Sequence, residues 1–208
     1  MRILVGCELS GRVRDAFRER GHNAWSCDTL PQEDYPLSTG REHIFHIEGD
    51  ILDAIHNEGP WDMVIAHPPC TYLCNSGVQH LHDVLQPERW GQMVEGAELF
   101  RDILNCGVKR ICVENPIPHG EATDIIGRKY TQIVQPFHFG HFERKATCLW
   151  LEGLPPLTPT KDVEAVTKLL PPNYVQKMWW EGAKGDLRAH IRSVTYQGLA
   201  DAMALQWG

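Results

Sequence analysis

Cys70 is the residue of this 208-residue chain whose surroundings point most directly to chemistry. It follows Pro68 and Pro69 directly, just after the apolar run 61–66, which has the length and β-branched content of a buried strand. Cys70 is therefore predicted on the loop at the strand's carboxyl end, where open α/β sheets gather ligands and catalytic groups. The prolines restrict their own φ and the residues before them, which stiffens the loop. Two interpretations stay open: a nucleophile, or a small buried hydrophobe.

Glu114 ends a second predicted strand, 109–114, and is the natural partner for such a nucleophile. Its strand neighbours are apolar, so we expect its carboxyl group to be partly desolvated and its pKa to be raised. A carboxyl group with a raised pKa can donate a proton near neutral pH. Cys70 and Glu114 are predicted to face one cleft.

The elements that position these residues alternate between strand and helix, which predicts an α/β fold with a mostly parallel, twisted, doubly wound sheet. The expected parallel strands are 2–7, 23–28, 43–48, 61–66 and 109–114. Helices are expected over 13–20, from Pro87 past Leu104, and over 198–206. Two further strands, 130–135 and 147–151, are predicted to form an antiparallel edge hairpin with a short loop. The stretch 152–192 is rich in proline, glycine, lysine and tryptophan without a clear period.

Acids also follow the other predicted strands. Asp28 is placed to accept hydrogen bonds from a ribose diol. Asp50 could accept from an adenine amino group or could cap the next helix, and both interpretations stay open. Gly11 would let a ligand approach the backbone closely. No Gly-x-Gly-x-x-Gly or P-loop pattern is present, so neither a dinucleotide fingerprint nor a Walker ATPase is supported.

The composition is that of an ordinary globular chain, with 42% hydrophobic and 23% charged residues. The seven cysteines are odd in number and scattered, which favours reduced thiols over a disulfide framework. No membrane-spanning run or basic-then-apolar leader is apparent, so a cytoplasmic protein without a membrane partner is the default expectation.

The net charge of −7 argues against a protein whose main task is to grip long duplex DNA, because phosphate neutralisation dominates that affinity. A local basic cluster remains possible at Arg12, Arg14, Arg18 and Arg20. Charged helix faces are more often simply solvated.

Taken together and in order, these motifs resemble those of the cytosine-5 DNA methyltransferases. Pro68-Pro69-Cys70, with Gly77 further on, is similar to the family's nucleophile loop, and Glu114-Asn115 is similar to its Glu-Asn motif. Three weaker likenesses are Gly49-Asp50-Ile51, Asp28 as the ribose-binding acid, and Phe139-Gly140 through Glu143-Arg144-Lys145-Ala146-Thr147 as the Gln-x-Arg-x-Arg region.

The resemblance implies a Rossmann-like class I fold that uses S-adenosylmethionine. The Cys70 thiolate would add to carbon 6 of cytosine while Glu114 protonates nitrogen 3, and carbon 5 would then take the methyl group. Since a thiolate is required, the cleft should lower the pKa of Cys70. The implied site residues are, for catalysis, Cys70, Glu114 and Arg144; for the cofactor, Cys7, Gly11, Asp28, Asp50, Ile51 and Pro68; and for the substrate, Pro69, Asn115, Lys145 and Thr147.

The chain departs from the family pattern in its first motif, where Cys7 and Leu9 replace phenylalanine and glycine. Lys145 and Thr147 stand in the places of two arginines, and the usual Gly-Asn of the last motif reads Gly198-Leu199. The chain also looks compact. We expect a catalytic core over 1–151, a small insertion over 152–192 in place of the target-recognition domain, and a returning helix over 193–208.

Several alternatives stay open at this point. A metal site would use His67, Cys70, Cys74, His80 and His82, although their spacing is not a strong zinc signature, and we expect no metal. A methyltransferase-like fold that has lost its catalytic activity could serve only to bind nucleic acid or protein. The substrate could be duplex DNA, whose target base must be flipped out of the stack. It could instead be single-stranded DNA or a free cytosine nucleotide such as dCMP, where no flipping is needed and Arg144, Lys145 and Arg192 could hold one phosphate. Homo-oligomerisation is open.

Overall fold

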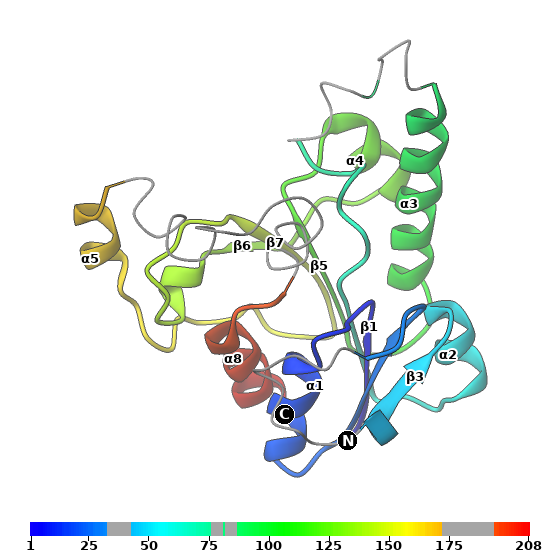
Figure 1. The fold of residues 1–208 in the computed structure, drawn as a ribbon, viewed down its shortest axis with the longest axis horizontal. Helices are drawn as coiled ribbons and strands as arrows, with labels where there is room; N and C mark the ends of the chain where they lie inside the picture. The colour runs from blue at the N-terminus through cyan, green and yellow to red at the C-terminus, as the bar shows by residue number, and fades with distance from the viewer. Residues whose placement is uncertain (33–42, 76–80, 82–86, 172–193) are drawn as a thin grey trace.

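The computed structural model describes residues 1–32, 43–75, 81, 87–171 and 194–208. Within these residues the chain forms one seven-stranded sheet in the order β3-β2-β1-β4-β5-β7-β6 (Figure 1). The strands are β1 (Arg2–Gly6), β2 (Asn23–Asp28), β3 (His46–Glu48), β4 (Met63–Ala66), β5 (Ile111–Pro116), β6 (Gln132–Val134) and β7 (Thr147–Glu152).

The first five strands are parallel, and β7 lies antiparallel to both β5 and β6. The central strands are buried on both faces, as expected for parallel strands whose connecting helices cover the sheet: Met63 to Ala66 of β4 and Ile3 to Val5 of β1 are fully inaccessible. The predicted fold class is therefore confirmed: an α/β, Rossmann-like, mostly parallel sheet with an antiparallel edge pair.

Helices cover both faces of the sheet. They are α1 (Arg12–Glu19), α2 (Ile51–Asn57), α3 (Glu88–Leu104), α4 (Gly120–Ile126), α5 (Glu164–Leu169) and α8 (Gln197–Trp207), with 3-10 turns at η1 (His43–Phe45) and η3 (Pro136–His138). One face is packed by α1 and α8, and the other by α2, α3 and α4 (Figure 1).

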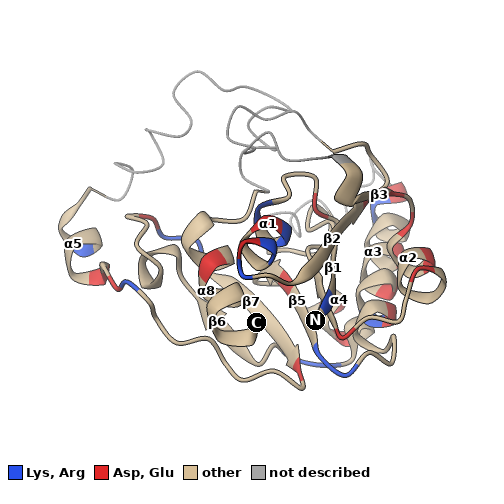
Figure 2. Cartoon of the chain, turned by 90° about the horizontal axis from the view of Figure 1, so that it is seen from below, with Lys and Arg blue, Asp and Glu red and all other residues tan. Residues whose placement is uncertain are grey.

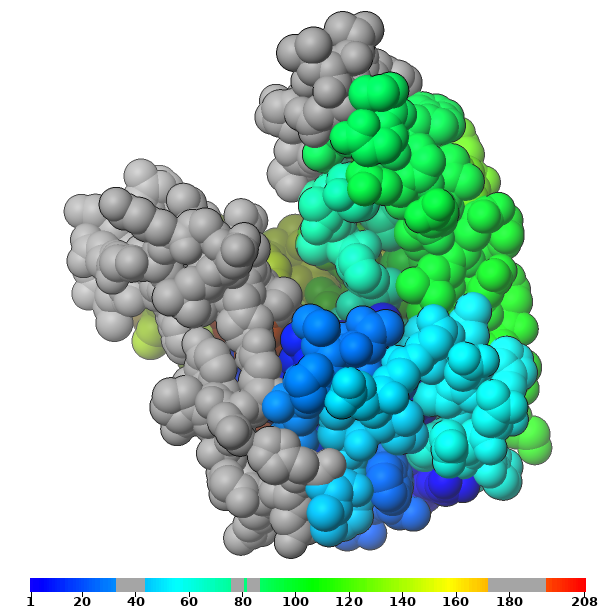
Figure 3. All heavy atoms as spheres, turned by 45° about the vertical axis from the view of Figure 1, so that its right-hand side comes forward, coloured from blue at the N-terminus to red at the C-terminus, as the bar shows by residue number. Residues whose placement is uncertain are grey.

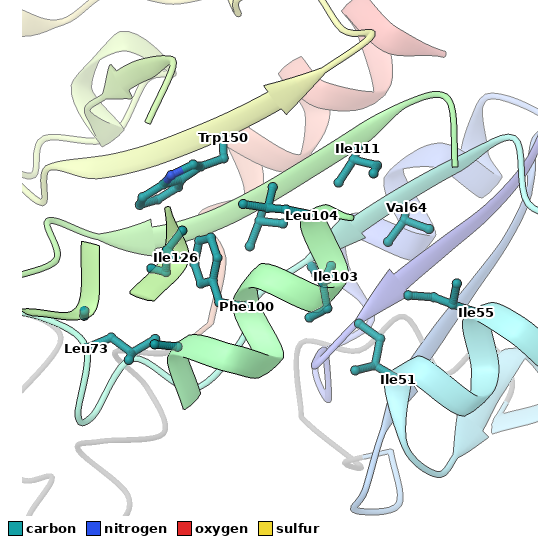
Figure 4. Close-up of a cluster of buried hydrophobic side chains, with 14 of the residues drawn as sticks. Ile51, Ile55, Val64, Leu73, Phe100, Ile103, Leu104, Ile111, Ile126 and Trp150 are labelled. Atoms are coloured by element: carbon teal, nitrogen blue, oxygen red, sulfur yellow. The ribbon is translucent and has the colours of Figure 1, made fainter. Parts of the chain in front are cut away.

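The core on the α2–α4 face fixes the segment that follows β4. Figure 4 shows Leu73 pointing into this cluster beside Phe100 of α3 and Ile126 of α4. Leu73 is almost fully buried, and its side chain lies in the space that a larger residue at Gly96 would fill. The loop after β4, which starts at His67, is therefore anchored by the hydrophobic burial of Leu73, in addition to the stiffness of its prolines.

Several predicted boundaries were wrong. The expected strand 43–48 begins with the 3-10 turn η1, so only its second half is a strand. The two edge strands are not joined by a short loop, since residues 135–146 lie between them and include η3. The stretch expected to be irregular contains α5, and its residues 172–192 lie outside the described part of the chain. The division of the chain at 151 and 192 stays a prediction.

Candidate functional site

The loop that carries Cys70 leaves the sheet between β1 and β5. Its first residue, His67, continues the strand pairing by donating its backbone amide to the Gly6 carbonyl across 3.0 Å. At Pro68 the carbonyl accepts a hydrogen bond from the Asn115 side-chain amide at 3.1 Å. After Cys70 the chain turns, because the amides of Leu73 and Cys74 both donate to the Cys70 carbonyl. The predicted place of Cys70, on the loop beyond the strand's carboxyl end, is confirmed.

A second set of contacts ties this loop to the segment that follows β5. The Asn75 amide donates to the Ile117 carbonyl at 3.1 Å, and the His119 amide donates to the Leu73 carbonyl at 3.0 Å. The buried His119 ring also donates from Nε2 to the Tyr72 carbonyl at 2.9 Å. Figure 3 shows the segment after β4, in turquoise, lying between the blue N-terminal surface and the green α3. The Cys70 and Glu114 segments are thus one connected unit.

Glu114 forms an ion pair with His67 inside this unit. The His67 Nδ1 donates to the Glu114 Oε2 across 2.9 Å, with only 8% and 13% of the two side chains exposed. Burial by itself raises the pKa of Glu114, but the hydrogen bond and charge of His67, together with Lys145, outweigh it and lower the pKa. The raised pKa predicted for Glu114 was therefore wrong, because the contact between Glu114 and His67 depends on tertiary packing that the strand pattern does not predict.

Cys70 lies near two charges and a second thiol. Its pKa is raised well above the ordinary value of 9.0, first by the contact with the Cys74 thiol, then by burial and by the charge of Glu114, while Lys145 acts in the opposite direction. The expectation of a lowered pKa was wrong for this form of the protein. Cys74, one helical turn further along the chain, is the cause that was missed.

Lys145, rather than Arg144, supplies the positive charge at the site. Lys145 acts on Cys70, Glu114 and His67 alike. Arg144 is exposed, and its guanidinium donates to the carbonyl of Thr167 in α5 at 3.1 Å. The catalytic role predicted for Arg144 finds no geometric support, since its side chain is engaged on another element.

The remaining predicted substrate residues lie around this unit. Pro69 is exposed at the loop's surface. Asn115 is buried and holds Pro68, so the role visible for it is positional. Thr147 is buried at the start of β7, paired with Pro116 of β5, and its hydroxyl donates to the Lys145 carbonyl at 3.2 Å.

A pocket of about 200 Å³ opens beside the unit, at the carboxyl ends of β1 and β2. It is lined by Cys7, Glu8, Leu9, Ser10, Asp28, His67, Pro69, Val194 and Thr195. Two residues predicted to bind the cofactor, Cys7 and Asp28, are therefore brought together. Ligand pockets typically measure about 300–1,000 Å³, so the described residues enclose room for part of a nucleoside-sized ligand.

The other predicted cofactor residues do not line this pocket. Asp50 caps α2, since its carboxylate accepts from the amides of Leu52 and Asp53, which is the capping alternative left open above. Ile51 is buried against Gly6 in the core. Gly11 stands at the start of α1 with a φ of 66°, and a β-carbon there would meet the Arg14 guanidinium. Pro68 is buried behind Pro69.

Glu8 is a site residue that the sequence reasoning missed. It is 4% exposed, and its two carboxylate oxygens accept from the amides of Val13 and Arg14 at the start of α1, at 2.7 and 3.3 Å. Burial raises the pKa of Glu8, and His67 is the charge that opposes this most strongly. The rule that singled out Asp28 and Glu114, an acid just beyond a strand end, would also have found Glu8.

The arginine cluster of α1 is engaged mostly within the protein. Arg14 is fully buried and donates to Ser26 and Gln32, and Arg12 donates to the Thr195 carbonyl. Arg18 donates to the Ala24 carbonyl and stacks over the Phe45 ring. Acidic and basic side chains are interspersed on α1 (Figure 2). These contacts leave Arg20 as the exposed member of the cluster.

The described residues contain neither a metal-binding cluster nor a membrane-spanning helix. Among them, no group of three or more His, Cys, Asp and Glu side chains is arranged to hold a metal ion, and His80 and His82 of the hypothetical zinc set lie outside the described part. None of the helices described is both long and apolar enough to span a membrane.

Comparison with known proteins gave matches to solved structures alone. No protein-family model matches the sequence, and no curated protein matches it. One similar structure is a candidate DNA modification methyltransferase encoded within a prophage of E. coli, at 12% identity and a TM-score of 0.41 over 73% of this chain and 46% of that one. Another is the methyltransferase EhMeth of Entamoeba histolytica, at 19% identity and a TM-score of 0.48 over 78% of this chain and 57% of that one. The chain thus spans about half the length of the structures it resembles.

Proposed function

We propose that the protein is an S-adenosylmethionine-dependent methyltransferase of the cytosine-5 type, in a compact form with a minimal target-recognition region. The observation that carries the proposal is that Cys70 and Glu114 lie at the same edge of the sheet, at the carboxyl ends of the neighbouring strands β4 and β5. Strands β4 and β5 pair in parallel, with Ala66 opposite Val113, so both residues leave the same edge of the sheet. Asn115 then fastens the Cys70 loop to β5.

The residues of the site divide the chemistry between them. The Cys70 sulfur bonds to carbon 6 of the cytosine, Glu114 delivers a proton to nitrogen 3, and carbon 5 becomes the nucleophile that takes the methyl group. Carbon 5 then loses its proton to water, and the bond between sulfur and carbon 6 breaks. The charge of Lys145 favours the Cys70 thiolate and opposes the effect of Glu114 on it.

S-adenosylmethionine, when bound, supplies the methyl group. The pocket beside the unit has the chemistry to hold such a ligand, because Asp28 at the end of β2 can accept from a ribose diol and the acidic lining suits a cationic molecule. Cys7 contributes a thiol whose pKa is raised to about 12 by burial and by Asp28, Cys27 and Asp50, so it lines the pocket as a neutral group.

We propose cytosine in DNA as the substrate, with dCMP as the second candidate. The resemblance of the sequence motifs to those of the cytosine-5 DNA methyltransferases favours DNA. The net charge of −7 and the engagement of the α1 arginines within the protein favour the small nucleotide, for which no base has to be flipped from a duplex.

One assay tests the proposal directly. Tritiated S-adenosylmethionine is offered with duplex DNA, single-stranded DNA and dCMP in parallel, to the natural protein and to Cys70→Ser. We expect label on one cytosine substrate with the natural protein and none with Cys70→Ser. Cys106→Ser is the matched control, since Cys106 is half-buried just beyond the end of α3 and should be dispensable. No transfer to any of the three substrates, or full activity of Cys70→Ser, would contradict the proposal.

A substrate that forms a stable covalent adduct distinguishes an active enzyme from a catalytically inactive binding module. An active protein should form a denaturation-resistant adduct with a 5-fluorocytosine substrate in the presence of S-adenosylmethionine, because the fluorine at carbon 5 cannot leave as a proton would. A pure binding module would retain DNA without forming any adduct.

A further inference from the structure

His67 lies between the pocket and the catalytic carboxylate and contacts both. Its Nδ1 holds Glu114 at 2.9 Å, while its ring lines the pocket together with Glu8. Its backbone amide donates to the Gly6 carbonyl of β1, and its side chain is only 8% exposed. His67, directly after β4, therefore contacts β1 through its backbone and β5 through Glu114.

The charged groups that face His67 come from three separate segments among the described residues. Glu114 stands on β5, Glu8 follows β1, and Lys145 precedes β7. Burial lowers the pKa of His67, but the hydrogen bond and charge of Glu114, with a contribution from Glu8, raise it overall, against the effect of Lys145. The contact between the two side chains thus favours a proton on His67 and the ionised form of Glu114.

The ionised form of Glu114 has no proton to give to the cytosine. An ionised Glu114 can only accept hydrogen bonds, whereas nitrogen 3 of cytosine needs a donor. His67 Nδ1 holds a proton directed at the Glu114 carboxylate across 2.9 Å. On the far side of the ring, Nε2 is buried and has no hydrogen-bond partner among the residues described, so no acceptor there stabilises the imidazolium.

We propose that His67 is a positioning residue that stores the proton which Glu114 delivers to nitrogen 3 of the cytosine. The proposal rests on the proposed function. The Cys70 thiol loses its proton to water as its sulfur bonds to carbon 6. At the same time the Nδ1–H bond of His67 breaks, the Glu114 carboxylate takes that proton, and the resulting carboxyl group forms the N–H bond at nitrogen 3. After methyl transfer, carbon 5 loses its proton to water and the bond between carbon 6 and sulfur breaks. Nitrogen 3 then returns its proton through Glu114 to His67, and the Cys70 thiolate takes up a proton from water, which ends the cycle with the protein unchanged.

The first test needs neither cofactor nor substrate. The imidazole nitrogens of the natural protein are titrated by NMR after 15N-histidine labelling, with His67 assigned from the loss of its signal in His67→Asn. We expect His67 to titrate above its ordinary value and to move down in Glu114→Gln, where the opposing charge is gone. A His67 titration that is the same in both proteins would overturn the proposal.

The second test separates proton storage from positioning. His67→Asn places an amide N–H near the position of Nδ1, so it can orient Glu114 but cannot store a proton. We expect kcat to fall by about 10²–10⁴-fold with KM for the cytosine substrate little changed, and the limb of the pH–kcat profile that belongs to the pair to disappear. His67→Gln serves as a second variant if His67→Asn does not fold. His56→Asn is the control, because His56 is exposed in the last turn of α2 and does not line the pocket.

The outcomes distinguish this inference from the function it rests on. An active natural protein with an equally active His67→Asn of unchanged pH profile would overturn the role of His67 and leave the methyltransferase intact. A natural protein that transfers no methyl group to any cytosine substrate would overturn both.

Discussion

Asn115 donates from its side-chain amide to the carbonyl oxygen of Pro68 across 3.1 Å, and both residues are buried. This bond joins strand β5 to the loop that carries Cys70, and Asn115 directly follows Glu114, the proposed partner of Cys70. The distance between the sulfur and the carboxylate is therefore set by the sheet and not by the loop alone.

Replacing Asn115 by alanine should loosen this connection. The Pro68 carbonyl would be left buried without its donor, which costs about 1–3 kcal/mol of unfolding free energy. Urea denaturation measures this loss, and the rate of adduct formation with a 5-fluorocytosine substrate should fall as well. Asn105→Ala is the matched control, because Asn105 bonds the Arg101 carbonyl at the exposed end of α3. Equal effects of the two substitutions would contradict the special position of Asn115.

Replacing Cys74 by alanine should make Cys70 more reactive. The Cys74 contact is the largest cause of the raised pKa of Cys70, so its loss moves that pKa toward the ordinary value of 9.0. Each unit of decrease raises the thiolate fraction at pH 8 roughly tenfold. The alkylation rate of the Cys70 peptide by iodoacetamide, followed by mass spectrometry, gives the measurement. Cys106→Ala should leave this rate unchanged, and an unchanged rate in Cys74→Ala would contradict the assignment.

Glu8 should make the folded protein less stable as the pH rises. Its pKa is raised above the ordinary 4.5 by burial, so its contribution to stability is fully present below that value and is lost as the pH rises through the folded-state pKa. Glu8→Gln removes the titration and should flatten this part of the pH dependence. Urea unfolding from pH 4 to pH 8 tests this, with the half-exposed Glu98→Gln as the control. Parallel curves for the natural protein and Glu8→Gln would contradict the prediction.

Gly198 should tolerate no side chain. A β-carbon there would overlap the Phe139 carbonyl oxygen and crowd the His141 ring, whose Nε2 accepts from the Gly198 amide. We expect Gly198→Ala to lose about 1–3 kcal/mol of stability by overpacking. Gly91 of α3 has open space around it, so Gly91→Ala should be neutral or stabilising by up to about 1 kcal/mol. Thermal unfolding of the two variants gives the comparison, and a harmless Gly198→Ala would be inconsistent with this packing.

Much of the fold follows from local pattern, because buried parallel strands are continuous apolar runs and the helices between them start and stop at prolines and glycines. The position of Cys70 beside Glu114 follows in turn from two neighbouring parallel strands. The pKa directions of both residues were mispredicted because their causes, His67 and Cys74, act through contacts that strand assignment does not supply. Arg144 was preferred over Lys145 by resemblance, and the acceptor that engages Arg144, the Thr167 carbonyl, belongs to a short helix without a clear sequence signal.

The reversed direction of β7 has a consequence for how this protein can vary. The parallel strands point their carboxyl ends toward the cleft, so the loop that follows each strand reaches it, as the loop after β4 does with Cys70. Because β7 runs the other way, with Thr147 opposite Pro116, it is the approach to the strand that reaches the cleft, and Lys145 stands on that approach. The positive charge of Lys145 therefore belongs to the segment that precedes β7 and not to the buried strand itself. A substitution of Lys145 can therefore change the charge at the cleft without replacing any core side chain of β7.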